Sequence, residues 1–187
     1  MKTLIEQRKH EPARAYRSWA IFDSDALVPK KPTAEALDKI DACKRSIVRH
    51  HMLVRRAIEN YLPYEELNSL IPHHPNNLSD RKTVGAFGRL RPDQRAHFNM
   101  KSGFQGDEAR LSQGGKDAQH KPAVDAHFGD VVTNDRQALA AGFGRDIARL
   151  FVPAPELGRP AISEAARRRD GQADEMIPLF RGIVRSL

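Results

Sequence analysis

The feature that most constrains the fold is a short apolar run that ends in two carboxylates. Residues 19–22 are Trp-Ala-Ile-Phe, and Asp23, Ser24 and Asp25 follow directly. Such a run is typical of a buried strand, and open α/β sheets bind ligands beyond the carboxyl ends of their strands. Because alternate strand residues point to one side, Asp23 and Asp25 are expected to face one spot. The pair suits Mg²⁺ or Mn²⁺, whereas the structural alternative is a turn that bonds its own backbone.

A strand–helix–strand unit is predicted around this pair. Thr33 is suited to cap a helix, and apolar residues at helical spacing predict that this helix runs from about Ala34 to Ser46. A second strand is predicted at residues 51–54. Since a helical crossover joins parallel neighbours, the two strands should lie side by side. Glu59 would then bring a third carboxylate to the same edge, unless it is a surface residue paired with a nearby arginine.

The rest of the chain is predicted to be helical, with one weakly ordered stretch. A helix should begin at Pro92, and Lys101 follows it in a loop, where it would be solvated or would steady a phosphate. Residues from about 105 to 130 are rich in small and polar types, which predicts a mobile insertion. Residues 152–187 contain a proline-rich linker and then a C-terminal helix, which should pack on the core or on a partner.

Composition limits the partners and the compartment. Lys and Arg number 31 against 24 acids, a net charge of +7, which favours a polyanion such as nucleic acid. Arginines in three stretches, 55–56, 89–91 and 167–169, are expected to contact its phosphates. The single cysteine, Cys43, is predicted to be a packing residue, and its isolation fits a reducing cytoplasm. No apolar run approaches a membrane span, so no membrane partner is expected.

Four segments together resemble a known arrangement. In this order they are similar to the Toprim-type domain of the overcoming-lysogenization-defect nucleases and related bacterial phage-defence proteins. The resemblance implies an α/β fold, a partial Rossmann-like parallel sheet flanked by helices over residues 17–151, followed by a helical C-terminal part. The four segments are residues 21–25, 55–63, 97–104 and 142–151.

The resemblance also implies an activity, a metal and a set of site residues. Such domains hold divalent cations, Mg²⁺ or Mn²⁺, to cut or rejoin the phosphodiester backbone of DNA. By position, Asp23 and Asp25 match the family's Asp-x-Asp pair, and Glu59 matches its next acidic position. Lys101 matches a lysine that some of these nucleases place near the scissile phosphate.

The sequence departs from the family before the Asp pair. A Toprim domain normally opens with a strand that ends in a glutamate, but only about twenty residues precede Asp23, and Glu6 and Glu11 follow no convincing strand. The chain is therefore expected to lack the first β-α-β part, which either lies on a partner chain or is lost together with the activity. No phosphate-loop motif is present, so an ATPase would also be a separate partner.

Two other functions stay open. Residues 21–25 also resemble the first motif of haloacid-dehalogenase-like phosphatases, with Asp23 as nucleophile and Asp25 as acid/base. Lys121, Asp130 and Asp135 imitate its later motifs, but Ala26 and Leu27 replace the expected Gly-Thr. The other alternative is a non-catalytic subunit that binds nucleic acid or protein through its basic surface.

Overall fold

The computed structural model describes residues 19–46, 48–64, 67, 81–113, 117–145, 147 and 173–185. Over these residues the fold is α/β, mostly helical, with a two-stranded sheet. Glu6, Glu11 and the proline-rich linker lie outside the described residues. No helix in the described ranges is long and apolar enough to cross a membrane.

The sheet confirms the predicted strand–helix–strand unit. β1 (Trp19–Phe22) pairs in parallel with β2 (Arg49–Met52), and α3 (Ala34–Arg45) forms the crossover. The Thr33 hydroxyl caps α3 by accepting a hydrogen bond of 3.3 Å from the amide of Ala36. β2 begins two residues earlier than predicted, because Arg49 pairs with Trp19 and so belongs to the strand. Arg49 is polar, and the local apolar pattern therefore does not predict it to be part of a strand.

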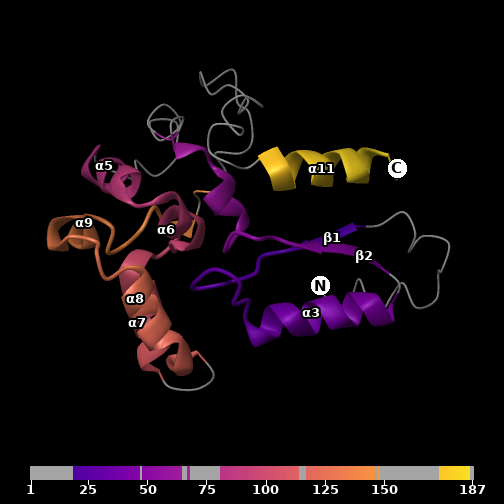
Figure 1. The fold of residues 1–187 in the computed structure, drawn as a ribbon, viewed down its shortest axis with the longest axis horizontal. Coiled ribbons are helices and arrows are strands. Elements are labelled where there is room, and N and C mark those ends of the chain that lie inside the picture. The colour runs from indigo at the N-terminus through magenta and orange to yellow at the C-terminus, as the bar shows by residue number, and fades with distance from the viewer. Residues whose placement is uncertain are drawn as a thin grey trace.

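Two helices cover opposite faces of the sheet, as Figure 1 shows. On one face Phe22 packs with Ile40 and Cys43 of α3, so the predicted packing role of Cys43 is confirmed. On the other face Trp19 packs against α11 (Ala173–Val184), the predicted C-terminal helix. Because side chains alternate along β1, this strand contributes apolar residues to the packing on both faces of the sheet.

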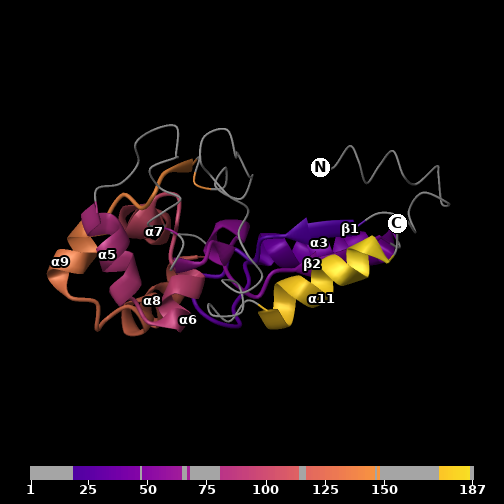
Figure 2. The same ribbon diagram turned by 90° about the horizontal axis from the view of Figure 1, so that it is seen from above.

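Short helices fill the other end of the molecule (Figure 2). Their core is a chain of aromatic rings in which neighbouring centroids lie 5.3 to 5.7 Å apart, the usual range for tilted and edge-to-face pairs. The rings belong to Phe87, Phe98, Phe104, Phe128 and Phe143. The elements are α5 (Arg81–Arg89), α6 (Pro92–His97), α7 (Gly103–Ser112), η3 (Ala118–His120), α8 (Lys121–His127) and α9 (Thr133–Ala138). The short helix η1 (Ile58–Tyr61) instead packs its apolar side chains in the cluster that contains Trp19 and α11.

The stretch from about 105 to 130, predicted to be a mobile insertion, is largely helical. Most of this stretch forms α7, η3 and α8, with residues 114–116 outside the description. Leu111, Val124 and Phe128 bury their side chains in the aromatic core. Each helix is short and carries only one or two large apolar residues that reach the core, and a composition average misses so sparse a pattern.

Candidate active site at the carboxyl edge of the sheet

The segments that follow β1 and β2 meet a loop from the helical half around an open cavity. The cavity has a volume of about 600 Å³. Three of the four residues predicted from sequence, Asp25, Glu59 and Lys101, line it, and Asp23 lies close enough to sense their charges. Other residues that line the cavity were not predicted from the sequence, among them Asn60, Asn99, Ser102 and Arg145.

The end of β1 is bonded to the segment after β2. Asp23 accepts a hydrogen bond of 2.9 Å from the Ile58 amide, and the Asp25 amide donates one of 2.9 Å to the Arg56 carbonyl. The Ser24 hydroxyl donates to the Arg55 carbonyl at 2.9 Å. These bonds hold both aspartates beside η1, which carries Glu59.

Asp25 adopts an uncommon backbone conformation. Its φ is 49°, in the left-handed region that few residues other than glycine enter readily. Aspartate is among the types that tolerate this region, and such residues cluster at functional sites. At Asp25 the chain turns away from β1, and the side chain of Asp25 lines the cavity at this point.

Glu59 is the most buried carboxylate of the site. Its side chain is 4% exposed and forms an ion pair of 2.9 Å with Lys101, whose side chain is 42% exposed. The second oxygen, Oε2, is buried and accepts no hydrogen bond from any residue that the structure describes. An unsatisfied buried carboxylate oxygen is costly, so each such atom in a folded protein calls for an explanation.

The surroundings of Asp23 favour its protonated form. Burial raises the pKa of Asp23, and the negative charges of Glu59 and Asp25 raise that pKa further. The Ile58 amide and Lys101 act in the opposite direction, but burial is the largest cause. A divalent cation would offset both the burial and the repulsion.

The three carboxylates do not form a ready-made metal cluster. Throughout the described ranges, no three His, Cys, Asp or Glu side chains come close enough together to hold an ion by themselves. Asp23, Asp25 and Glu59 thus share an edge without converging on one point. Mg²⁺ usually binds only one or two carboxylates together with waters and substrate phosphates. The donors present here therefore suit an open Mg²⁺ site rather than a site that the protein closes on all sides.

Arg56 corrects one expectation. It is 5% exposed and forms two hydrogen bonds of 2.7 Å to Asp107, so it is not a surface residue available for nucleic-acid phosphates. Its partner lies 51 residues away in sequence, a separation over which no local pattern pairs two side chains.

The residues that imitate the later phosphatase motifs, Lys121, Asp130 and Asp135, lie elsewhere. None of them lines the cavity, and each pairs with a side chain of the helical half. The pairs are Lys121 with Asp125, Asp130 with Arg91 and Asp135 with Arg89. This arrangement does not favour the phosphatase alternative.

Comparisons with protein-family models, with curated proteins and with solved structures find no match to this chain.

Proposed function

We propose that this cavity hydrolyses phosphodiester bonds of nucleic acid, DNA in the first place, with Mg²⁺ or Mn²⁺, in a partial Toprim-like sheet. The observation that carries the proposal is that Glu59 lines the same cavity as Asp25 and has a buried oxygen without a hydrogen-bond partner among the described residues. A bound cation gives that oxygen a partner. It also explains why carboxylates gather at the end of a parallel strand pair.

Each residue of the site has a role in this proposal. Asp25 and Glu59 hold the cation, and Asp23 lies near enough to complete its surroundings. The cation supplies an activated water and offsets charge on the phosphate. Lys101, half-exposed beside Glu59, binds a phosphate oxygen as negative charge develops there, and Arg145 lies exposed at the rim to bind a neighbouring phosphate.

The small sheet leads to a proposal about partners. The protein has two strands in its described sheet, whereas the Toprim resemblance implies a preceding β-α-β part. We propose that another chain supplies this part or an associated ATPase. The net charge of +7 supports nucleic acid as the substrate, because basic proteins attract polyanions.

The test is cleavage of supercoiled plasmid in Mg²⁺, in Mn²⁺ and in EDTA. We expect metal-dependent nicking by the wild-type chain and a loss of at least about 100-fold in Asp25→Asn, the scale of losing one preorganised electrostatic group. Asparagine tolerates the left-handed conformation of Asp25, so this substitution changes charge rather than backbone. Asp38→Asn, on the exposed surface of α3, is the matched control for charge.

A second candidate is a non-catalytic nucleic-acid-binding subunit. The observation that favours it is that Lys101 already neutralises one oxygen of Glu59, in a site without a three-carboxylate cluster. DNA binding without nicking in either metal, unchanged in Asp25→Asn, would support this candidate. Nicking retained in Asp25→Asn would contradict the nuclease proposal.

A further inference from the structure

Asn99 closes one side of the loop that carries Lys101, through both its side chain and its backbone carbonyl. Between α6 and α7, Asn99 accepts a hydrogen bond of 3.1 Å from the Ser102 amide through its side-chain oxygen. Its backbone carbonyl accepts a second, of 2.8 Å, from the Gly103 amide. Lys101 lies inside this turn, so the direction of its side chain depends on how Asn99 is held.

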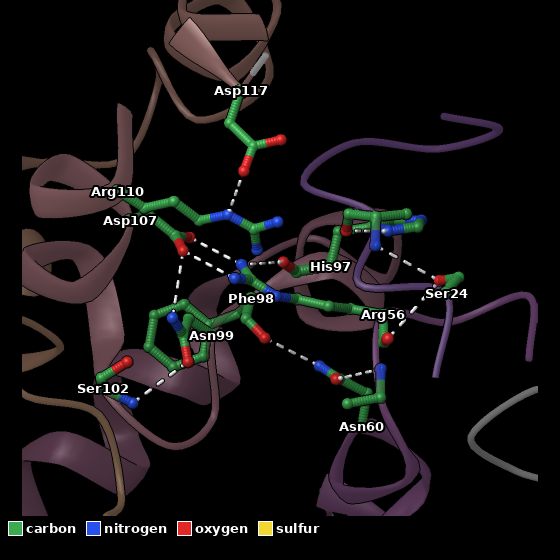
Figure 3. A network of polar contacts seen from close by, with 12 residues as sticks. Ser24, Arg56, Asn60, His97, Phe98, Asn99, Ser102, Asp107, Arg110 and Asp117 are labelled. Carbon is green, nitrogen blue, oxygen red and sulfur yellow. Dashed lines mark hydrogen bonds and ion pairs between the residues drawn. The ribbon is translucent and has the colours of Figure 1, made fainter. Parts of the chain in front are cut away.

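Asn99 is held by a buried ion pair, which Figure 3 shows. Its side-chain nitrogen donates to Asp107 at 3.0 Å. Asp107 in turn accepts two hydrogen bonds of 2.7 Å from Arg56. The side chains of Arg56 and Asp107 are 6% and 7% exposed, and a two-bond arginine–carboxylate contact fixes both distance and orientation.

The same arginine also fixes the acidic edge through its main chain. The Arg56 carbonyl accepts the Asp25 amide at 2.9 Å, and its own amide donates to the Ala96 carbonyl at 2.9 Å. The main chain of Arg56 therefore holds the aspartate turn, while its side chain leads through Asp107 to the lysine loop. The two halves of the cavity are joined through one residue.

We infer that Arg56, Asp107 and Asn99 form a positioning network that holds Lys101 against Glu59. A role of this network in catalysis rests on the proposed function, whereas its role in positioning Lys101 does not depend on that function. Backbone bonds from Phe143 to Met100 (2.7 Å) and from Gly144 to Lys101 (3.0 Å) support the other side of the loop. They need no side chain of Asn99, so they should keep the loop folded when Asn99 changes. Loss of the bond to Ser102 should then let the 99–102 turn shift, which moves Lys101 away from Glu59.

The test measures how fast the Lys101 amine is acetylated by limiting acetic anhydride, read by peptide mass spectrometry without substrate. Release from an ion pair of this exposure should raise the rate about threefold in Asn99→Ala. Lys39, paired with Glu35 on α3 at 2.9 Å, is the internal reference and should not change. Glu59→Gln, which removes the carboxylate charge opposite Lys101, gives the rate of the released amine.

Two further variants separate positioning from folding. Asn99→Asp is isosteric and keeps the acceptor for Ser102, but it sets a carboxylate oxygen against Asp107, so it should also release Lys101. Gln105→Ala, exposed on α7, should match wild type. Wild-type labelling of Lys101 in both Asn99 variants would overturn the inference. Because no substrate is present, failure of the wild-type chain to cut plasmid would count against the proposed function alone.

Discussion

At the scale of single residues, each of the two aspartates after β1 carries a local cost. Asp23 is half-buried near two other carboxylates, and Asp25 has a positive φ. Neither arrangement stabilises the fold by itself. Local costs of this kind are typical of functional sites, where other parts of the structure maintain a geometry that folding alone would not favour.

The raised pKa of Asp23 predicts how stability depends on pH. The folded state keeps the Asp23 proton to a higher pH than the unfolded chain, whose ordinary value is 3.8, so stability falls as pH rises between the two values. Asp23→Asn removes this loss and keeps an acceptor for the Ile58 amide. We expect its melting temperature to exceed that of wild type at pH 7.5, with the difference shrinking toward pH 4.

Calorimetry between pH 3.5 and 8 in EDTA measures this difference, with the exposed Asp38→Asn as the control. Adding Mg²⁺ should then raise the melting temperature of wild type more than that of Asp23→Asn, since the ion relieves the same repulsion. An Asp23→Asn variant less stable than wild type at neutral pH would contradict this explanation.

At the scale of elements, the site depends on two loops that lie against each other. The amides of Phe104 and Gln105, at the start of α7, donate to the carbonyls of Leu139 and Ala140 at 3.3 and 2.9 Å. Gly103 has a φ of 59°, and a Cβ there would lie 2.1 Å from the Leu139 carbonyl oxygen. Only glycine permits this approach, because both the conformation and the space exclude a side chain.

Gly103→Ala should therefore destabilise the protein by about 3 kcal/mol or more, from left-handed strain together with a backbone clash. Gly85→Ala, inside α5, is the matched control, since its Cβ would meet only the Arg89 side chain at an ordinary 3.5 Å. It should stabilise by roughly 0.5–1 kcal/mol through helix propensity. Urea denaturation midpoints measure both, and equal effects would show that the loops do not pack in this way.

At the scale of the whole molecule, α11 joins the C-terminal part of the chain to the sheet and to η1. Glu175 accepts hydrogen bonds from the Val54 amide at 2.9 Å and from His51 at 2.7 Å, and it also accepts one from the Tyr61 hydroxyl. Met176 is 1% exposed in the cluster that contains Trp19. Through these contacts α11 holds the segment that follows β2 and carries Glu59.

Met176→Ala should lower the free energy of unfolding by about 2–5 kcal/mol, the range for emptying a buried site of this size. Val184→Ala, 70% exposed on the same helix, should stay within roughly 0.5 kcal/mol of wild type.

Trp19 is the single tryptophan, so its fluorescence reports the sheet and α11, while circular dichroism reports all helices. Coincident transitions by both probes would show that the two ends unfold together.

Local pattern predicted much of the framework. The apolar run, the cap and the crossover spacing predicted β1, α3 and the parallel neighbour β2, and helical spacing predicted α11. It failed for α7 and α8, where too few apolar residues mark the helices. Within the site, the rule that parallel strands end at one edge predicted that Glu59 lies near Asp25. No local pattern predicted the pair of Arg56 and Asp107.

The sequence by itself determined where the acids stand, because strand periodicity and a helical crossover place the residues after two parallel strands at one edge. Only the tertiary structure decided that Lys101 faces Glu59, how far each of them is buried, and that one Glu59 oxygen has no hydrogen-bond partner among the described residues. The physical reason is range. Backbone preferences act over a few residues, whereas burial and ion pairing depend on groups that folding brings together from distant parts of the chain.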